Sequence, residues 1–366
     1  MGDRMRITFV TPPPELSGGM RVIAAHAGGL SRRGHTVTVV FTPHRPFGVR
    51  ERLRSLVRRG VWLSTPDLDP TFFEGLDVAL RGVERWRPIV ADDLPDADVV
   101  VATWWETAEW VLALPPAKGA KAYLVQGYEA HSYLPVDRVN RTYTFPMHKV
   151  VVARWLADLM ASRFGDHDAS LVPNSVDTDL FHAPPRGKQP VPTVGLAYST
   201  VPCKACEVAL AAFEPARQAV PGLRLVSFGT TPPAREMPLP PDAVFTLAPR
   251  QAALRDLYAS SDAWLMPSRS EGFGLPILEA MACRTPAIAT RTGAAPELLE
   301  GGGGILVNPE DSEGMARAIE RLCGLSESEW RAMSDSAYTT ATRYTWDDAT
   351  DLFEAALRTA IERTAG

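Results

Sequence analysis

The pattern that most restricts the fold is an alternation of short apolar runs with longer helical stretches. An apolar run at Met5–Val10 is followed by the polar loop TPPPELSGG and by a helical stretch at Met20–Arg33. A second apolar run follows at His35–Phe41. Further runs lie at Ala97–Thr103, Lys121–Gln126 and His148–Val152. This order is typical of a doubly wound parallel sheet, whose ligands bind at the carboxyl ends of the strands.

The alternation stops at a proline-rich segment and starts again after it. The segment His182–Pro192 carries four prolines and predicts an extended interdomain linker with few contacts. After it, strands are expected at Val194–Tyr198, Leu223–Phe228, Ala263–Met266, Ala287–Ala289 and Gly304–Val307. A chain of 366 residues is long enough for two cores. We therefore predict an α/β protein with two Rossmann-like, doubly wound domains, residues 1–185 and 186–345, facing each other across a ligand-binding cleft.

A glycine-rich turn between two glutamates carries the most specific chemical signal. Glu271 stands directly before Gly272-Phe273-Gly274, and Pro276 is expected to open a helix that carries Glu279. Glycines let a ligand approach the backbone, and the N-terminus of a helix is favourable for phosphate. Glu279 would lie about 4.5 Å along the helix axis and lean back toward its start. The alternative is a solvated loop followed by an ordinary surface charge.

The stretch EGFGLPILEAMA, with glutamates at 271 and 279, resembles the E-x7-E donor signature of family 4 glycosyltransferases, which are retaining enzymes of GT-B fold. The resemblance implies that Glu271 contacts sugar hydroxyls and that Glu279 holds the nucleotide ribose. It implies that the backbone amides of Gly272, Phe273, Gly274 and Leu275 contact the sugar and the phosphates. It also implies that the last helix, within 346–366, packs back on the first domain. Arg284 departs from the family pattern, which usually has glycine there.

Lys204 is the candidate cation for the donor diphosphate. A lysine near the start of a helix is unfavourable for the helix dipole unless an anion binds beside it. The resemblance implies that this lysine stabilises the leaving diphosphate together with an arginine after the strand glycine. Here Leu-Ala-Tyr-Ser follows Gly195, so Tyr198 or a neighbouring hydroxyl substitutes for the arginine, or the charge is absent. The resemblance also predicts that a loop at Phe245–Gln251 brackets the base. A surface lysine is the alternative for Lys204.

Two segments of the first domain supply further candidates. Gly18 and Gly19, in the loop after the first strand, would let phosphate approach the backbone. In YLVQGYEAH, Gln126 stands where many members of the resembled family have histidine. In this segment the chain resembles a rhamnosyltransferase-like subgroup, in which glutamine and glutamate recur here. Glu129 is predicted to activate or orient the acceptor hydroxyl, and His131 is a further candidate. A carboxylate that caps the next element is the alternative for Glu129.

Composition excludes several classes of partner. The net charge of −5 argues against a general polyanion binder, so no nucleic acid is expected. Without an apolar window of about 20 residues, no membrane span is predicted. The start, MGDRMRITFV, has too short an apolar run for a secretory signal, so we expect a cytoplasmic protein.

No metal or cofactor is predicted, apart from the nucleotide sugar as co-substrate. Cys203 and Cys206 form a single C-x-x-C without a second pair or a histidine at zinc-ligand spacing. Asp177-Thr178-Asp179 has the form of a D-x-D metal motif. We interpret it as structural, because hard cations need several converging oxygen ligands.

The run 47–63, FGVRERLRSLVRRGVWL, is basic and amphipathic. Such a helix can lie on an anionic membrane, which would place the protein at the inner membrane face. The alternative is a helix packed on its own domain.

These features together predict a retaining glycosyltransferase. It would move a sugar from a nucleoside-diphosphate sugar to a hydroxyl of a carbohydrate, lipid-linked or small-molecule acceptor. Two alternatives remain open at this stage: a nucleotide-sugar 2-epimerase of the same architecture, and a non-catalytic protein that binds the donor or the acceptor.

Overall fold

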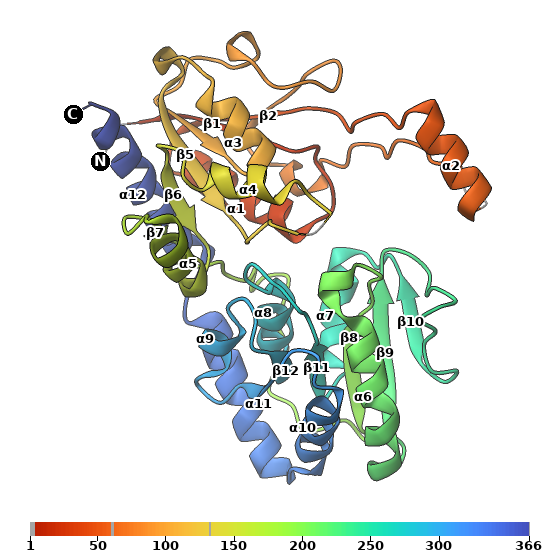
Figure 1. Ribbon diagram of the computed structural model, residues 1–366. Coiled ribbons are helices and arrows are strands. Elements are labelled where there is room, and N and C mark those ends of the chain that lie inside the picture. Colours follow the sequence, from red (N-terminus) through yellow and green to blue (C-terminus); the bar gives the residue numbers. More distant parts are fainter. Residues whose placement is uncertain (1–3, 60–61, 132, 366) are drawn as a thin grey trace. The chain divides into compact units, whose positions relative to one another are not determined.

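The computed structural model describes residues 4–59, 62–131 and 133–365. Gly60 and Val61 of the basic run, and Gly366 of the C-terminal segment, lie outside these residues, as do 1–3 and 132 of the predicted first domain. The chain divides into two compact units. Unit 1 comprises Met1–Val172 and Asp347–Gly366, and unit 2 comprises Pro173–Trp346 (Figure 1). The first boundary falls at Val172, before the predicted position 185.

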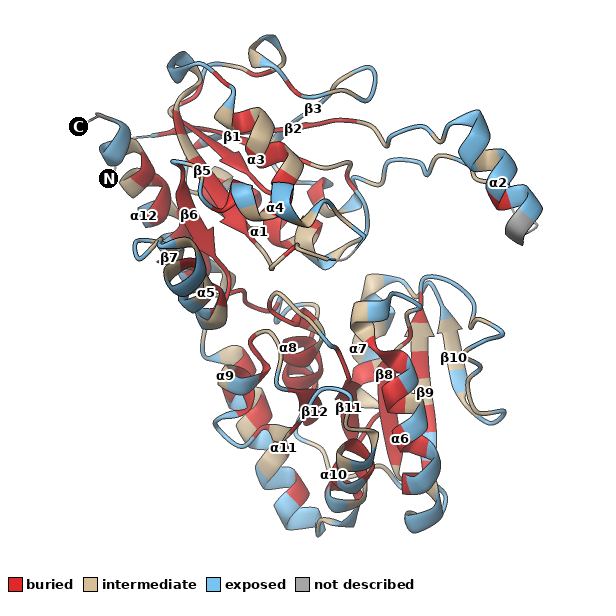
Figure 2. Ribbon diagram, viewed as in Figure 1, coloured by how far each residue is buried: buried red, intermediate tan, exposed pale blue. Residues whose placement is uncertain are grey.

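Unit 1 is built on a parallel sheet whose described strands run in the order β3-β2-β1-β4-β5-β6-β7. These strands are β1 (Arg6–Thr11), β2 (Thr36–Phe41), β3 (Ala79–Gly82), β4 (Val99–Ala102), β5 (Ala120–Val125), β6 (His148–Val151) and β7 (Ser170–Leu171). Phe9 of β1 lies between Val39 and Val101 in the register. The central strands are buried on both faces, which explains their continuous apolar sequences (Figure 2). The strand order reverses between β1 and β4, so ligands are expected at the carboxyl ends of these strands.

The helices of unit 1 lie against this sheet, apart from α2, which protrudes from it (Figure 1), and one of them comes from the end of the chain. They are α1 (Gly18–Arg32), α2 (Val49–Arg59), α3 (Trp105–Leu112), α4 (Val136–Thr142), α5 (Arg154–Phe164) and α12 (Trp346–Ala365), with short 3-10 turns at Thr71–Phe73, Ala91–Asp93 and Pro116–Lys118. Phe353 of α12 is fully buried and stacks on His26, with ring centroids 4.3 Å apart. Arg33, at the end of α1, pairs with Asp351 at 2.7 Å. Helix α12 is therefore part of the core of unit 1.

Unit 2 repeats the architecture with a second parallel sheet, in the order β10-β9-β8-β11-β12-β13. Its strands are β8 (Thr193–Ala197), β9 (Arg224–Gly229), β10 (Val244–Leu247), β11 (Ala263–Met266), β12 (Ala287–Thr290) and β13 (Gly304–Val307). Its helices are α6 (Cys206–Ala219), α7 (Gln251–Ala259), α8 (Leu275–Ala282), α9 (Ala295–Leu299), α10 (Ser312–Gly324) and α11 (Glu327–Thr342), with the 3-10 turn η4 at Pro202–Lys204. Buried Leu265, Phe213 and Trp330 belong to one continuous core. The predicted α/β class with two Rossmann-like sheets is confirmed.

The segment His182–Pro192 is not the contact-poor linker that its prolines predict. The Arg186 guanidinium lies over the Trp330 ring at 4.6 Å and donates to the Ser261 carbonyl. The Lys188 ammonium donates to the carbonyls of Cys323 and Leu325 at 2.5 and 2.8 Å. Both carbonyls lie at the C-terminus of α10, where a cation is favourable. The prediction was wrong because these polar side chains bind the body of unit 2 and not solvent.

Three strands of the described residues, β3, β7 and β10, were not predicted. β3 and β10 are short edge strands and β7 has only two residues. The sequences of β3 and β7 lack an apolar run, whereas the apolar residues of β10 were assigned to the loop Phe245–Gln251. The predicted loop Phe245–Gln251 is therefore wrong at both ends. Its first residues belong to β10, and Gln251 begins α7.

Helix α2 does not fit the alternative of a helix packed on its own domain. A helix packed on its own domain would bury its apolar side chains. In the described part of α2, Leu53, Leu56 and Val57 are instead exposed. By contrast, the polar Ser55 of α2 is buried.

Candidate functional site

Lys204 lies at the end of η4, in the connection between β8 and α6. Ala205 follows in the left-handed conformation, with φ of +49°, and turns the chain into α6. The Lys204 ammonium donates to Glu271 Oε1 at 2.7 Å. Burial alone would lower the pKa of Lys204, but the charge of Glu271 and this hydrogen bond outweigh burial and raise it. Because the lysine side chain keeps 41% of its exposure, it remains accessible to a ligand.

Glu271 is held more tightly than its partner, with only 9% of its side chain exposed. The Ser268 hydroxyl donates to the same carboxylate oxygen at 2.7 Å. Gly293, with φ of +56°, passes so close that a Cβ there would lie 2.8 Å from the Glu271 Cβ. The glycine thus permits the loop before α9 to pack on the turn that contains Glu271.

The glycine-rich turn leads directly into α8. Gly274 adopts φ of +99°, a conformation in which a side chain would be strained, and serves as the N-cap of α8. The helix begins at Leu275, one residue before the predicted start at Pro276. Phe273 is fixed by a hydrogen bond from the Ala294 amide to its carbonyl at 2.9 Å. The turn Gly272–Leu275 therefore presents the N-terminus of α8 beside Glu271 and Lys204.

Glu279 lies deeper along α8 and is 3% exposed. Its Oε2 accepts a hydrogen bond from the Tyr258 hydroxyl of α7 at 2.6 Å. Tyr258 is itself fully buried and contacts Trp264, with ring centroids 4.4 Å apart. The inner carboxylate of the E-x7-E pattern is therefore held in a fixed orientation by Tyr258, which the sequence analysis did not identify.

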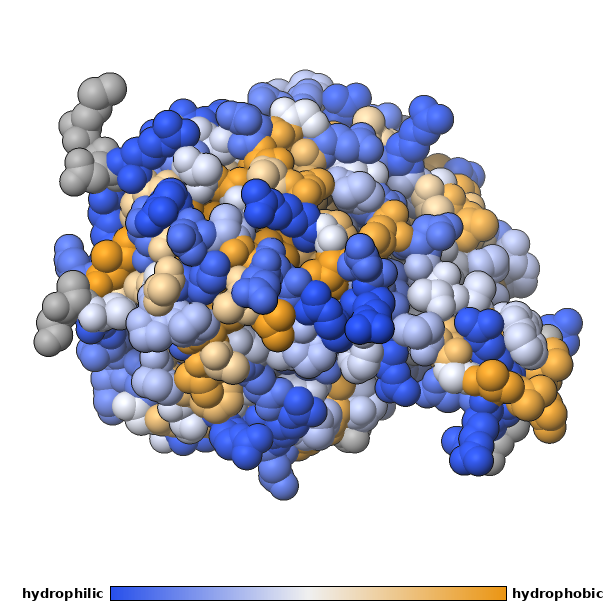
Figure 3. All heavy atoms as spheres, turned by 90° about the horizontal axis from the view of Figure 1, so that it is seen from above, coloured by the Kyte–Doolittle hydropathy of each residue, from blue (hydrophilic) through white to orange (hydrophobic). Residues whose placement is uncertain are grey.

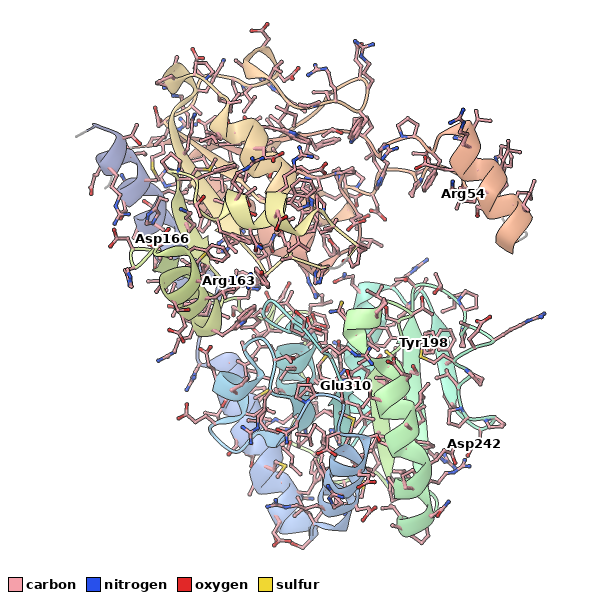
Figure 4. The ribbon with its side chains drawn as sticks, in the orientation of Figure 1. Arg54, Arg163, Asp166, Tyr198, Asp242 and Glu310 are labelled. Carbon is pink, nitrogen blue, oxygen red and sulfur yellow. The ribbon has the colours of Figure 1, made fainter. Side chains whose placement is uncertain are left out.

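Arg269 is a residue of this site that sequence reasoning missed. Its backbone amide donates to the Cys203 carbonyl at 2.8 Å, next to Lys204. Its guanidinium pairs with Glu207, in the first turn of α6, and with Glu310, before α10. Figure 4 labels Glu310. Arg269 thus fastens η4 to the loop that carries Glu271. Only the adjacency of β8 and β11 brings these segments together, so no local sequence signal could have found it.

Tyr198 was predicted as a substitute for the missing family arginine. Its side chain is 4% exposed, and its hydroxyl donates to the Met237 carbonyl at 2.8 Å and accepts from the Ala234 amide at 2.9 Å (Figure 4). The hydroxyl is therefore bound to the 234–237 loop. The structure pairs Lys204 with Glu271 and not with Tyr198.

In unit 1, two predicted segments meet at the carboxyl ends of β1 and β5. Gly18 and Gly19 form the first turn of α1, which Ser17 caps by accepting from the Met20 amide at 3.3 Å. A Cβ on Gly19 would lie 3.4 Å from Gln126 Nε2. Gly19 and Gln126 are therefore neighbours, although 107 positions separate them (126 − 19).

Glu129 is buried, at 5% exposure, and not presented on a surface loop. Its Oε2 accepts from the Trp105 amide at 3.1 Å, at the N-terminus of α3. Burial raises the pKa of Glu129 well above its ordinary value, although the hydrogen bond from the Trp105 amide acts in the opposite direction. The Glu129 carboxylate therefore caps a helix, as the alternative prediction proposed. The capped helix is α3, which precedes Glu129 in the chain, and not the element that follows it. The ring of the other candidate, His131, stacks on Tyr133 at 5.2 Å.

The described residues contain no group of three or more histidine, cysteine or acidic side chains arranged to hold a metal ion. Asp177 Oδ1 accepts from the amides of Asp179 and Leu180 at 3.0 and 3.2 Å, which makes it part of a local turn. Within the described ranges, no helix combines the length and the apolar character that a membrane crossing would require.

Residues 191–324 match the family model of glycosyl transferases group 1. Among the curated relatives, D-inositol 3-phosphate glycosyltransferase of Segniliparus rotundus is 28% identical over 247 residues, which are 63% of this chain and 52% of that protein. Three other proteins of that name match at 35–40% identity but over only 24–29% of their length. The matched part of the chain thus spans between 24% and 52% of the length of these relatives.

Solved structures match over almost the whole chain. Sucrose-phosphate synthase of Thermosynechococcus elongatus has a TM-score of 0.73 at 15% identity and covers 98% of this chain and 100% of its own. The Anabaena protein HepE, solved in complex with UDP and glucose, has a TM-score of 0.70 at 18% identity and covers 97% and 99%. The resemblance to family 4-type glycosyltransferases of GT-B fold is confirmed by the family model and the fold. The matched range contains Lys204, Glu271 and Glu279.

Proposed function

We propose that this chain is a retaining glycosyltransferase that moves a sugar from a nucleoside-diphosphate sugar to an acceptor hydroxyl. The observation that carries the proposal is the Lys204–Glu271 pair, 2.7 Å apart, beside the N-terminus of α8. Both side chains lie within the matched glycosyl transferases group 1 range. A fold shared with a protein solved with UDP and glucose supports a nucleotide sugar as the donor.

Lys204 and Glu271 are placed to bind two neighbouring parts of one ligand, the diphosphate and the sugar. A diphosphate at the start of α8 would accept hydrogen bonds from the Gly272–Leu275 turn and would attract the Lys204 ammonium. Glu271, relieved of part of its contact with Lys204, would accept hydrogen bonds from sugar hydroxyls. Glu279, oriented by Tyr258, would accept from the ribose.

The proposed reaction breaks the bond between the sugar C1 and the donor phosphate oxygen and forms a bond from C1 to the acceptor oxygen on the same face. The acceptor proton goes to the leaving phosphate, and the products are the glycoside and the nucleoside diphosphate. Lys204 and the helix terminus would stabilise the charge that develops on the leaving diphosphate. Gly18, Gly19 and Gln126, which lie together in unit 1, are proposed to contact substrate. The buried Glu129 is better suited to support α3 than to receive the acceptor proton.

The test compares UDP binding and donor turnover in Lys204→Met and Glu271→Gln. Lys204→Met should weaken UDP binding in calorimetry at least tenfold, because it removes the cation beside the diphosphate. Glu271→Gln should bind UDP but lose roughly 10²–10³-fold in donor turnover, the usual cost of removing one preorganised polar contact. Arg217→Met, which removes an arginine paired with Asp242 at 3.0 Å, is the matched control and should match the wild type.

Three results would contradict this proposal. UDP binding and turnover unchanged in both variants would place the donor elsewhere. NMR of UDP-glucose incubated without acceptor would expose the alternative chemistry, since an epimerised nucleotide sugar would identify an isomerase. Inversion at C1 of a glycoside product would disprove the retaining stereochemistry.

A further inference from the structure

Helix α2 carries an apolar face that unit 1 does not cover. Successive helical residues are rotated by about 100°, so side chains at 49, 53, 56 and 57 fall within one arc of about 100°. The four residues of this arc, with their exposed fractions, are Val49 (71%), Leu53 (49%), Leu56 (43%) and Val57 (85%). Trp62, just beyond the helix, is 52% exposed. A soluble helix normally turns such an arc toward a core.

Arginines border this apolar arc on both sides. By the same rotation, Arg50 and Arg54 follow one edge of it, and Arg52 follows the other. The Arg52 guanidinium lies over the Trp62 ring at 5.9 Å, which joins the tryptophan to the same surface. Figure 4 labels Arg54 on α2, and Figure 3 shows hydrophobic and hydrophilic atoms side by side on this protruding helix.

The charge of α2 is opposite to that of the whole chain. Its sequence, VRERLRSLVRR, contains five arginines and one glutamate, a net charge of +4 (5 − 1), whereas the chain carries −5. A partner of α2 must therefore be anionic and must also accept apolar side chains. The headgroup region of an anionic lipid bilayer meets both requirements, because phosphates face the arginines and acyl chains receive the apolar arc.

We infer that α2 binds the surface of an anionic membrane and lies parallel to it. The apolar arc inserts at the boundary between headgroups and acyl chains, and the arginines on its flanks contact lipid phosphates. Nucleic acid fits less well, because a phosphate backbone offers nothing to the four apolar side chains. The inference concerns only α2 and Trp62, and it does not depend on the donor site of unit 2.

The experiment measures co-sedimentation of the full chain with vesicles of phosphatidylglycerol and phosphatidylcholine, and with phosphatidylcholine alone. The wild type should bind the anionic vesicles at low ionic strength and dissociate in about 1 M salt, where charges are screened beyond ~3 Å. Arg50→Ser with Arg54→Ser should weaken binding about 30-fold, from about 1 kcal/mol per arginine near the surface. Leu53→Ser with Leu56→Ser should weaken it at least about tenfold, because two aliphatic side chains no longer insert.

A matched control tests whether any exposed apolar pair would matter. Leu80 and Val90 of unit 1 are 39% and 50% exposed, and Leu80→Ser with Val90→Ser should bind vesicles as the wild type does. All variants should keep the Tm and the far-UV circular dichroism spectrum of the wild type, which shows that each is folded. Absence of wild-type binding to anionic vesicles at low salt would overturn the inference. So would equal binding by the wild type and the Leu53 and Leu56 variant, or tight binding to duplex DNA that this variant retains.

Discussion

At the scale of single residues, Glu271 and Glu129 show two ways to keep a carboxylate inside a protein. Glu271 has a lysine at 2.7 Å and a serine hydroxyl at the same distance, so its charge is compensated. Glu129 accepts a hydrogen bond instead from the Trp105 amide, which is neutral. A buried carboxylate with neutral partners prefers to hold its proton.

Glu129 should therefore make the stability of the protein depend on pH. Its pKa is raised in the folded state, so the folded protein binds the proton more tightly than the unfolded chain does. The resulting stability is present below the ordinary glutamate pKa and is lost as pH rises toward the raised value, at up to about 1.4 kcal/mol per pH unit. Glu129→Gln keeps an oxygen acceptor for the Trp105 amide and cannot ionise. As pH rises from the ordinary glutamate pKa toward the raised value, the Tm of Glu129→Gln should fall less than the Tm of the wild type, as measured by thermal unfolding at each pH. Parallel Tm curves would contradict the assignment.

Single residues also show what could be predicted from sequence. Glu271, the glycines and Glu279 lie within one short segment, so their spacing alone placed them on one turn and one helix. The Lys204–Glu271 contact joins residues that are far apart in sequence, and it exists because β8 and β11 are neighbours whose following loops share an edge. The binding of the Tyr198 hydroxyl to the 234–237 loop and the burial of Glu129 depend on three-dimensional packing that no local pattern encodes.

At the scale of elements, the site depends on how η4, α8 and their loops are fixed. Sequence predicted the start of α8 within one residue, because Gly274 and Pro276 are strong local signals. It also identified Arg284 as unusual. Arg284 takes a left-handed φ of +63° just after α8, where glycine would be unstrained. Its guanidinium lies over the Tyr338 ring at 3.9 Å and pairs with Asp335 of α11, so these contacts offset the strain.

Arg269 is expected to position Lys204 by fastening η4 to α6 and to the loop before α10. In Arg269→Met, the Lys204 ammonium would be less well placed, so donor KM should rise about tenfold with a small change in Tm, since exposed ion pairs contribute at most about 1 kcal/mol each. Steady-state kinetics with a UDP-sugar donor measure the effect.

A double-mutant cycle separates positioning from a general structural role. If Arg269 acts through Lys204, Arg269→Met should add little to the loss already caused by Lys204→Met, giving a coupling energy within the roughly 0.5–3 kcal/mol known for interacting pairs. Additive losses in the double variant would show that Arg269 acts independently. Arg255→Met, at a surface arginine beside Asp256, serves as the control.

At the scale of the whole molecule, each unit has its own sheet and its own core, but the two units use the chain differently. Unit 2 is one continuous segment, Pro173–Trp346, whereas unit 1 is completed by Asp347–Gly366. The alternation of strands and helices predicted two such sheets from local periodicity. The edge strands β3, β7 and β10 were missed, whereas the edge strand β13 was predicted. The contacts of His182–Pro192 were missed because polarity does not reveal a partner.

The dependence of unit 1 on α12 gives a test that distinguishes the two cores. Phe353 is fully buried against His26 and lies 6.0 Å from the Phe9 ring, so Phe353→Ala should cost about 3–5 kcal/mol. Hydrogen exchange followed by mass spectrometry should show faster exchange in β1 and α1, with unit 2 peptides and UDP affinity unchanged. Leu352→Ala, at the neighbouring residue with 44% exposure, should leave both units unaffected. Faster exchange in both units together would mean that they unfold as one cooperative body, and unchanged exchange in β1 would remove α12 from the core of unit 1.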